Sequence, residues 1–464
     1  MRTKRPPTFL RVNARCTAYG IDIILNDDVF PIRYPAQVWR RYPTRSKKLL
    51  MDALALSATY FVPQIVNVPT IHYLTRRSFA EPYLFKNGLY DMATTAHSDK
   101  QSSTAYIKNY INVSRCFSSD PMILPAIGRE RKQSPVAVIP FTFGKETLLT
   151  LALALEAGMK PILVAVREPA HTYEFHHKKN LARTFTKETD IPIFFIDYLP
   201  GIMRYGALWN KQTELGWGLQ TTEYAMLCAP FISYYSASYL CIGNEHSCDT
   251  SDIDSEGVIT HWSGYDQHHE WTPHQSTVVS LLCGSPVTVA SFVESLNELA
   301  EMLVLHRRFP ALGAYQTSCL GINASARAKR WCERCQKCAC MYLFCRVVGR
   351  DPAELGFTKN LLDKNHASLF SGFFTVKEDD EFYGLIEEVE TALLSLYRRG
   401  DRDHTIVAFS SSLSGADVRR IEKQAHAMFT IHPPSTLPQT LYKKFHPLFA
   451  KELGHAYEEL IRIP

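Results

Sequence analysis

Five of the twelve cysteines in this chain lie in one short stretch, RWCERCQKCACMYLFC, at positions 330–345. Three of them, Cys332, Cys335 and Cys338, form a C-x2-C-x2-C array, and Cys319 lies upstream in the sequence TSCLG. Four thiolates in two groups, joined by a loop, can complete the tetrahedral shell of a zinc ion. An iron–sulfur cluster uses the same kind of thiolate set, and the spacing alone does not exclude it. We predict a metal site on these four cysteines, with a structural Zn²⁺ ion as its occupant.

The other interpretations of the cysteines are a disulfide framework and a redox pair. The first residues, MRTKRPPTFLRVNARC, are basic but lack the apolar run and the cleavage site of a secretory signal. We therefore expect a cytoplasmic protein with reduced thiols, which disfavours disulfides. A redox C-x-x-C pair usually belongs to a thioredoxin-like unit. Cys340 and Cys345 fall within an apolar helical pattern, and we expect them to pack as buried thiols.

A second candidate site lies in the stretch VIPFTFGKETLLTLALA, which joins an apolar strand to a helix. The N-terminus of such a helix offers unpaired N–H groups and a positive partial charge to an anion. Gly144 allows the backbone to approach a phosphate closely, Lys145 adds a cation, and Thr142 and Thr147 supply hydroxyl groups. The stretch does not have the two widely spaced glycines of the P-loop. The alternative interpretation is an ordinary strand–turn–helix junction.

Polar residues also follow a later expected strand, in YLCIGNEHSCDTSD. Asn244, Glu245 and His246 come directly after this strand, at the edge where open α/β sheets bind ligands. Glu245 is a candidate ligand of a Mg²⁺ ion bound to phosphates, because magnesium prefers oxygen ligands. The alternative is a surface acid in a turn.

The stretch HWSGYDQHHEWTPHQSTVVSLL is rich in histidine and aromatic residues. His268, His269 and His274 are candidates for a catalytic proton shuttle or a pocket for a substrate phosphate. The alternative is a loop that covers the site, in which the histidines serve only as hydrogen-bonding groups.

The elements that must position these residues follow from the apolar pattern. Short apolar runs rich in β-branched residues predict buried strands, and helical periodicity predicts the segments between them. Strands are expected at 134–141, 160–168, 191–199 and 238–243, and helices at 145–158, 177–190 and 221–236. This alternation predicts an α/β fold with a doubly wound, mostly parallel sheet.

The flanking regions have a different pattern. The predicted domains are an N-terminal α+β accessory domain (1–130), an α/β domain that ends at the cysteine site (131–348) and a helical C-terminal region (349–464). In the first we expect a hairpin over 19–34, a helix over 45–62 and a polar loop over 92–106. In the last, an amphipathic helix is expected over 378–400.

Composition limits the classes of partner. The 464 residues are 46% hydrophobic and 21% charged, which is ordinary for a globular protein. The formal charge of +5 is compatible with phosphate-bearing ligands and is not a strong nucleic-acid signal. The longest uncharged stretch, 225–243, is expected to be a buried helix followed by a buried strand, so no membrane span is predicted. The oligomeric state cannot be predicted from these patterns.

The turn TFGKET resembles the pyrophosphatase loop of the PP-loop ATPases, whose pattern is Ser-Gly-Gly-x-Asp-Ser. Aligned with that pattern, Thr142 and Thr147 replace the two serines, Glu146 replaces the aspartate and Gly144 matches the second glycine. Phe143 in place of the first glycine is a real departure. The resemblance implies a PP-loop (HUP-like) fold and ATP binding by residues 142–147 (Thr142, Phe143, Gly144, Lys145, Glu146, Thr147), Asn244 and Glu245.

The cysteines add a second resemblance within this superfamily. TSC followed by CERCQKC is similar to the zinc-binding set of the 7-cyano-7-deazaguanine synthases. The same layout of loop and cysteines resembles the ATP-dependent epimerases of UDP-N-acetylmuramoyl-L-alanyl-L-glutamate, a peptidoglycan precursor used in cell-wall biogenesis. The epimerases also have an extra N-terminal region and a similar total length, whereas the synthases are much shorter. The resemblance covers residues 130–345.

The epimerase resemblance implies an enzyme that uses ATP and Mg²⁺ to adenylate a small carboxylate substrate. Adenylation removes the carboxylate charge, so that the neighbouring α-proton can be removed and returned on the other face. Candidate catalytic residues are Lys145, His246, His268, His269 and His274. The alternatives are an amide- or nitrile-forming ligase like the synthases, and a non-catalytic or tRNA-directed nucleotide-binding protein; thiolation of tRNA would need cysteines near ATP, such as Cys241 or Cys248.

Overall fold

One mixed sheet of ten strands forms the centre of the protein. The computed structural model describes residues 9–128, 134–168, 172–319, 321, 324–371 and 386–460. In spatial order the strands of the sheet are β12 (Thr288–Ser291), β9 (Tyr239–Ile242), β6 (Val136–Pro140), β7 (Lys160–Arg167), β8 (Ile193–Tyr198), β3 (Asp28–Arg33), β2 (Gly20–Leu25), β1 (Leu10–Thr17), β4 (Thr70–Tyr73) and β5 (Ser114–Phe117). Six of the nine neighbouring pairs are parallel, which confirms an α/β fold with a mostly parallel sheet.

Helices cover both faces of the parallel half of this sheet. Alternate residues of β6 enter two different cores, with Ala137 and Ile139 in one and Val136 and Val138 in the other. The first core also contains α6 (Lys145–Glu156) and α7 (Thr172–Thr189). The second contains α8 (Gln220–Leu227), α9 (Ala229–Tyr235) and α10 (Thr272–Cys283). Burial on both faces explains why these strands are continuous apolar runs.

The N-terminal residues extend the same sheet. The expected hairpin is β2 and β3, which pair antiparallel around a turn in which Asn26 has φ 55°. Because β3 also pairs with β8, strands on both sides of the predicted boundary at residue 130 belong to one sheet. The helix expected over 45–62 is α2 (Thr44–Thr59), followed by the short α3 (Val62–Val66).

The polar loop expected over 92–106 was wrong. This segment contains the end of α4 (Glu81–Ser98) and the start of α5 (Ser103–Asn112). Met92, Ala93 and Ala96 are buried on α4, so its apolar face stabilises the helix in spite of the polar sequence. Ser102 caps α5 by accepting a hydrogen bond from the N–H of Ala105.

The helix expected over 221–236 consists of two helices. The chain breaks between α8 and α9 at Cys228, two residues before Pro230, whose ring nitrogen has no N–H to donate. Among the described residues one helical stretch, Thr44–Val66, is long and apolar enough to cross a bilayer, and 89% of its apolar window is buried inside the protein. This stretch is the α2–α3 segment of the second core.

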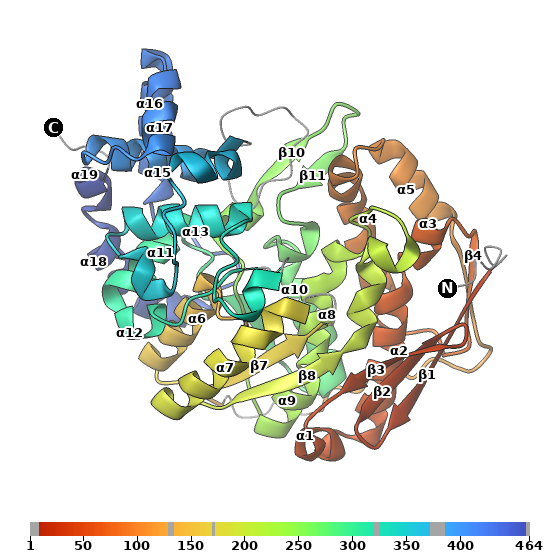
Figure 1. Ribbon diagram of the computed structural model, residues 1–464. Coiled ribbons are helices and arrows are strands. Elements are labelled where there is room, and N and C mark those ends of the chain that lie inside the picture. Colours follow the sequence, from red (N-terminus) through yellow and green to blue (C-terminus); the bar gives the residue numbers. More distant parts are fainter. Residues whose placement is uncertain are drawn as a thin grey trace.

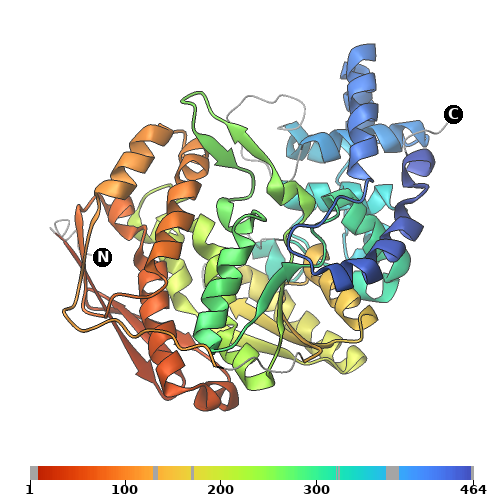
Figure 2. The same ribbon diagram turned by 180° about the vertical axis from the view of Figure 1, so that it is seen from behind.

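The C-terminal half is mostly helical and packs against the α/β part. Its main helices are α11 (Glu298–Arg308), α12 (Pro310–Gly313), α13 (Gln336–Val347), α15 (Ile386–Arg398), α16 (His404–Ser412), α17 (Gly415–Met428), α18 (Gln439–Leu453) and α19 (Ala456–Leu460). The helix expected over 378–400 is represented by α15, and its first residues, 378–385, lie outside the described residues. α15 packs on α13, and α18 packs on α11. The C-terminal helices and the N-terminal strands lie at opposite ends of the molecule (Figures 1 and 2).

Candidate active site and metal centres

Three segments that carry polar residues meet at one edge of the sheet. β6 and β9 are neighbours, but the helix after β6 packs on one face and the helices before β9 pack on the other. This reversal creates the switch point at which open α/β sheets bind ligands, outside the carboxyl ends of the strands. The segments that leave this edge are 141–147 after β6, 243–249 after β9 and 292–298 after β12.

The turn after β6 has an unusual backbone at Phe143. Its φ is 64°, in the left-handed region that glycine adopts without cost. The ring is buried and packs edge-to-face against Phe141 and Phe185, with centroids 4.7 and 5.6 Å away. Packing of the ring therefore offsets a backbone cost of about 1–2 kcal/mol. A phenylalanine stands where the PP-loop pattern has glycine, and its backbone conformation is the one that glycine favours.

Short side chains hold the rest of the turn. The hydroxyl of Thr142 accepts a hydrogen bond from the N–H of Gly144, and the hydroxyl of Thr147 donates to the Gly144 carbonyl. Gly144 caps α6, and a Cβ atom there would lie 2.4 Å from Oε2 of Glu146. A Cβ at Gly243 would lie 2.8 Å from Cβ of Glu146. The two glycines let the ends of β6 and β9 approach the start of α6.

Lys145 lies among carboxylates. Its side chain is fully buried, and Nζ lies 2.5 Å from Glu146, 3.1 Å from Glu245, 3.2 Å from Glu298 and 3.2 Å from Glu301. The sequence predicted a cation available to a phosphate, but the ammonium has no exposed surface in this arrangement. It acts instead as the shared counter-ion of residues from α6, α11 and the segment after β9.

A second lysine, Lys337 of α13, takes part in the same cluster. Its ammonium lies 3.0 Å from the Glu298 carboxylate, so two cations face four carboxyl groups. The N–H groups of Glu298 and Leu299 donate to the carboxylate of Glu388 on α15, at 3.0 and 2.6 Å. Glu388 thereby satisfies the first turn of α11, where an acidic side chain complements the helix dipole.

The surroundings lower the pKa of two carboxyl groups of the cluster and raise the pKa of the other two. Burial favours the neutral acid at each of them. At Glu146 and Glu298 the nearby Lys145 and Lys337 outweigh burial, and the pKa of each lies below its ordinary value. At Glu245 and Glu301 burial prevails, and the pKa is raised, well above the ordinary range for Glu301. For Lys145, burial opposes the charge, but the four carboxylates outweigh it and raise its pKa.

Three of these carboxyl groups have the arrangement of a cation site. One oxygen each from Glu146, Glu245 and Glu301 lies within 4.8 Å of the others. Both carboxyl oxygens of Glu301 are buried without a hydrogen-bond partner among the described residues. Buried oxygen ligands of this kind suit a hard divalent cation such as Mg²⁺, which would compete with the Lys145 ammonium for the same carboxylates.

The predicted cysteine set is brought together in space. Sγ of Cys332 lies 3.5 Å from Sγ of Cys335 and 3.6 Å from Sγ of Cys338. Cys319 joins Cys332 and Cys338 in a buried group whose sulfur atoms lie within 4.8 Å of one another. A tetrahedron of sulfurs about 2.3 Å from zinc has edges of roughly 3.8 Å, so the arrangement is compatible with zinc.

Four cysteines outside this group are buried and resist ionisation. Burial raises the pKa of Cys340 and Cys345, to about 12 in each case. Burial also raises the pKa of Cys241 and Cys248, the two thiols nearest the carboxyl end of β9. None of these four has the lowered pKa that marks a nucleophilic thiol.

The histidine candidates fall into separate places. His246 stacks on His432, which lies between α17 and α18, with ring centroids 3.5 Å apart and planes 9° apart. Burial and then His432 lower the pKa of His246 to about 4, so the ring is neutral near pH 7. His268 and His269 lie beside Asp249, where the Nδ1 of His269 is 3.0 Å from the Asp249 carboxylate.

His274 has a different set of neighbours. Its Nε2 lies 3.3 Å from Nζ of Lys86 on α4, and its ring stacks on Trp271. The contact with Lys86 places it against the N-terminal helices rather than among the other histidines. Asn244 is buried, and its side-chain amide donates to the carbonyl of Gln267, which ties the segment after β9 to the histidine-rich loop.

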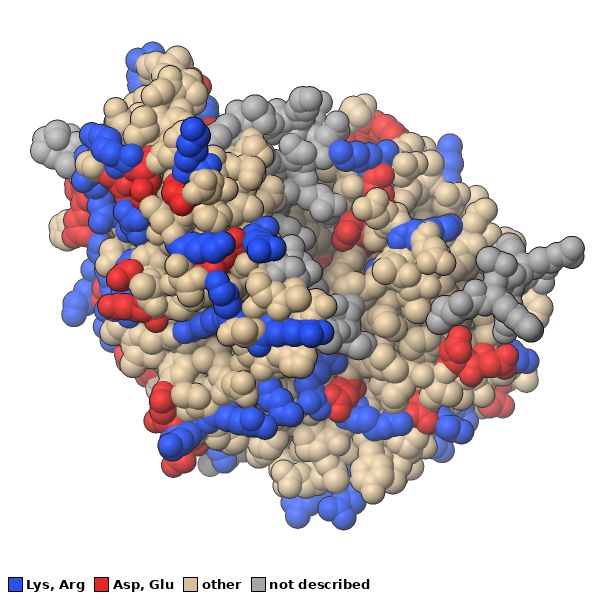
Figure 3. All heavy atoms as spheres, viewed as in Figure 1, with Lys and Arg blue, Asp and Glu red and all other residues tan. Residues whose placement is uncertain are grey.

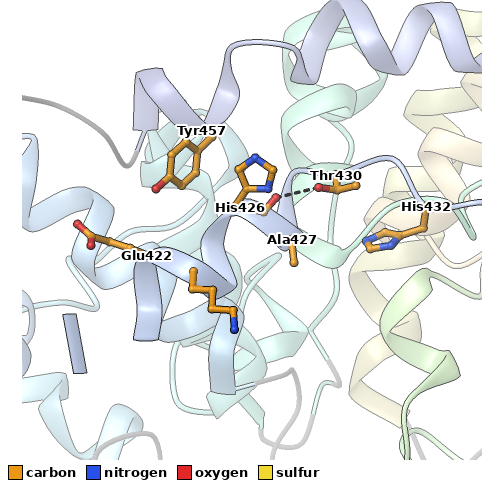
Figure 4. Close-up of a pocket in the computed structure, with 7 residues that line it drawn as sticks. Glu422, His426, Ala427, Thr430, His432 and Tyr457 are labelled. Atoms are coloured by element: carbon orange, nitrogen blue, oxygen red, sulfur yellow. Dashed lines mark hydrogen bonds between the residues drawn. The ribbon is translucent and has the colours of Figure 1, made fainter. Parts of the chain in front are cut away.

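Two pockets lie near these groups. A small one at the carboxyl ends of β6 and β7 is lined by the polar Thr142, Glu168 and Tyr224 and by apolar side chains that include Val164, Val166 and Phe175. The other, of about 460 Å³, lies between α17 and α19. Figure 4 shows His432 at one end of it, on the opposite side from Tyr457, so the residue that stacks on His246 also lines this pocket.

Basic side chains gather on the face that carries α7 and α13, with acidic side chains among them (Figure 3). Arg327 lies over the ring of Tyr173 on α7, 4.8 Å from its centroid. Lys329 is paired with Glu333 at 3.0 Å. Part of the basic character of this face is therefore taken up by contacts within the chain.

Comparison with known proteins does not assign the chain to a group: no family model matches it, and no curated protein matches it.

Sequence reasoning missed several members of these clusters. Glu298 and Glu301 were overlooked, although their i, i+3 spacing after the apolar run PVTVASFV is typical of a helix that follows a buried strand. Lys337 lies inside the cysteine stretch and was read only as part of the metal motif. Asp249 and His432 carry no local signal, because only the tertiary fold places them beside the candidate histidines.

Proposed function

We propose that this protein is a PP-loop-type enzyme that uses ATP to adenylate a substrate carboxylate. The substrate we favour is UDP-N-acetylmuramoyl-L-alanyl-L-glutamate, whose terminal glutamate is epimerised with release of AMP and pyrophosphate. The observation that carries the proposal is the turn 142–147 at the switch point of the sheet, where Phe143 has the left-handed φ of 64° that a glycine would adopt. This supports the alignment with the pyrophosphatase loop at its one divergent position.

The surroundings of the turn suit a nucleotide. The start of α6 presents its N-terminus to the edge of the sheet, where an anionic group is stabilised by N–H groups and by the helix dipole. Beside it, the pocket at the ends of β6 and β7 combines the exposed Thr142 with the apolar walls of Val164, Val166 and Phe175. A flat, apolar base and a charged phosphate chain would use these two neighbouring surfaces.

The buried carboxylates of this cluster suit a Mg²⁺ ion, which prefers oxygen ligands. Glu146, Glu245 and Glu301 would hold it, and its charge would offset the phosphate charge in the reaction. Lys145 keeps the carboxylates together in the absence of such a cation, because its ammonium lies within 3.2 Å of Glu298 and Glu301. The zinc site on α13 and the preceding loop would hold Lys337 in position beside Glu298.

The chemistry proposed has two parts. A carboxylate oxygen of the substrate attacks the α-phosphorus of ATP, an acyl–adenylate bond forms, and pyrophosphate leaves. The acyl adenylate has lost the carboxylate charge, so a base removes the α-proton and a proton returns on the opposite face. Hydrolysis then releases AMP. Neutral His246, on the segment that also carries Glu245, is available to accept a proton, and His268 and His269 are the further candidates.

The test is turnover in deuterated buffer. Incubation with Mg-ATP and the glutamyl substrate should give AMP and pyrophosphate in equal amounts, with deuterium at the glutamyl α-carbon. Thr142→Val, at the nucleotide pocket, should slow AMP formation, whereas Thr277→Val changes an exposed threonine on α10 and should not. Turnover without deuterium incorporation would rule out epimerisation while leaving adenylation intact.

Two other functions give different results in the same assay. A ligase like the 7-cyano-7-deazaguanine synthases would need ammonia and a deazapurine acid for AMP formation. A non-catalytic or tRNA-directed protein would form no AMP with any small carboxylate. Thiolation of tRNA is disfavoured because burial raises the pKa of both Cys241 and Cys248, which keeps them as unreactive thiols.

A further inference from the structure

The segment after β9 and the loop before α10 together form a further cluster of possible metal ligands. Asp249 supplies one carboxylate, and His268 and His269 supply two imidazoles from the loop that precedes α10. One ligand atom from each of the three lies within 4.8 Å of the other two. From the geometry of this cluster we propose that it is a binding site for a first-row divalent transition metal, such as zinc or ferrous iron.

The contact between His269 and Asp249 supports the binding of one metal ion by both side chains. Their Nδ1 and Oδ1 atoms are 3.0 Å apart, yet Nδ1 of His269 is buried and makes no hydrogen bond in the described part of the chain. The Asp249 Oδ1 atom accepts a hydrogen bond from the backbone N–H of His269, at 2.7 Å, and the imidazole nitrogen lies beside it without being bonded to it. Neighbouring ligands of one metal ion have this relationship, because each lone pair is directed at the ion and not at the other ligand.

The second imidazole is held as metal-binding histidines usually are. His268 is 5% exposed, and its ring lies close to the backbone of Asp249. Its Nδ1 accepts a long bond, 3.3 Å, from the N–H of Glu270, which a metal ion would replace. A histidine ligand typically donates its other ring N–H to a carbonyl or carboxylate, which fixes the ring and strengthens the ligand.

Further polar groups surround the cluster. His246, His261 and Glu270 lie around the cluster, with the ring of His261 5.1 Å from that of His268. Nε2 of His261 is also buried without a hydrogen-bond partner among the described residues. The side chain of His269 is 36% exposed, so solvent or a substrate reaches the site from that side.

Two imidazoles and one carboxylate on one side leave coordination positions open, which is the pattern of catalytic rather than structural sites. The cluster is therefore unlike the closed cysteine set. It lies four residues beyond Glu245 on the same segment, next to the carboxylates that we assign to the nucleotide reaction. The assignment of the metal does not depend on that reaction. If His268 and His269 bind a metal ion, His246 is the candidate histidine that remains for proton transfer.

Cobalt binding to the full-length apoprotein tests the site. Cobalt at the cysteines absorbs through sulfur-to-metal charge transfer, whereas cobalt on nitrogen and oxygen ligands shows only ligand-field bands, so the two sites are observed separately. With excess Mg²⁺ present to occupy Glu146, Glu245 and Glu301, the wild-type protein should bind two cobalt ions per chain. Asp249→Asn and His269→Gln should each weaken the ligand-field site by more than about 100-fold, because each removes a direct ligand, and should leave the thiolate bands unchanged.

The matched control is His274→Gln, which changes a histidine at the start of α10 whose contacts are with Lys86 and Trp271. It should bind two ions. Retained thiolate bands in each variant show that it is folded. A wild-type protein that binds one cobalt ion, only through the cysteines, would overturn the proposal, as would equal binding by wild type and by both ligand variants.

Discussion

The ammonium of Lys145 lies 3.2 Å from the carboxylate of Glu301, and both side chains are fully buried. Glu301 nevertheless has no hydrogen-bond partner for either oxygen among the described residues, and its pKa is raised well above its ordinary value of 4.5 by burial. The charged form of the Glu301 carboxyl is therefore energetically unfavourable at the candidate site. Replacing it with a neutral side chain tests this.

We expect Glu301→Gln to stabilise the protein at pH 8 in the absence of divalent cations, by about 1–3 kcal/mol, the usual cost of an unsatisfied buried group. The folded-state pKa is raised, so the carboxyl binds its proton more tightly in the folded state than in the unfolded state. Its contribution is fully favourable below pH 4.5 and is lost as pH rises through the folded pKa. The gain from Gln should therefore be smaller at pH 5.5 than at pH 8, as measured by urea unfolding. A larger gain at the lower pH would contradict this.

The same variant also tests whether Glu301 binds a divalent cation in addition to pairing with Lys145. Magnesium should raise the melting temperature of the wild-type protein, because an ion that binds only the folded state stabilises it. Glu301→Gln should lose most of this increase. The matched control is Glu294→Gln, a buried carboxyl that accepts hydrogen bonds from Thr436 and Leu437 instead. It should retain the magnesium response, although it destabilises the protein. An equal response in all three proteins would remove the case for the carboxylate site.

Phe143 allows a test of its backbone conformation. Phe143→Gly and Phe143→Ala both lose the ring and should cost about 3–5 kcal/mol, the usual penalty for truncating a buried phenylalanine. Because φ is 64° at this position, the Ala variant also keeps a Cβ atom in the left-handed region. We expect Gly to be more stable than Ala by about 1 kcal/mol or more. Urea unfolding gives the order directly, and equal stabilities would mean that the left-handed conformation is not maintained.

Cysteines of the metal set and cysteines outside it should respond differently to substitution. Cys332→Ser should abolish the thiolate-bound metal ion and lower the melting temperature, because metal binding contributes to folding free energy. Cys345→Ala removes a buried thiol outside the set and should keep the metal ion, at a cost of about 1 kcal/mol. Metal analysis after dialysis checks both. Retention of metal by the Cys332 variant would exclude that residue as a ligand.

Acid should destabilise the protein through its neutral histidines. Burial lowers the pKa of His246 and of His261 to about 4, from an ordinary value of 6.5. Both are neutral in the folded and unfolded states above pH 6.5 and contribute nothing there. Below pH 6.5 these histidines bind protons in the unfolded state but not in the folded state. The free energy of unfolding therefore falls between pH 6.5 and 4.

His261→Asn should reduce this loss of stability between pH 7 and pH 5, measured as the change in the free energy of unfolding in metal-free buffer. His426→Asn is the control, since that histidine is exposed on α17. The interpretation fails if the two variants respond to acid alike.

The sequence alone was sufficient for the parts of the fold that local pattern governs. Buried strands such as β6 and β7 are apolar on both faces, and the helix between them shows its own periodicity, so strand, turn and helix were predicted close to their observed bounds. Cys332, Cys335 and Cys338 were predicted for the same reason, since C-x2-C spacing brings thiols together over a single turn. The loop over 92–106 was wrong because burial of α4 against the rest of the protein, and not local composition, decides its conformation.

The tertiary structure alone decided what the predicted residues face. Lys145 was expected to meet a phosphate, but α11 and the segment after β9 surround it with Glu245, Glu298 and Glu301. His432 reaches His246 across 186 positions of the chain, a distance that no local pattern can encode. Such contacts depend on the order of strands and the packing of distant helices, because charge and hydrogen-bonding partners are set by position in space and not by separation along the chain.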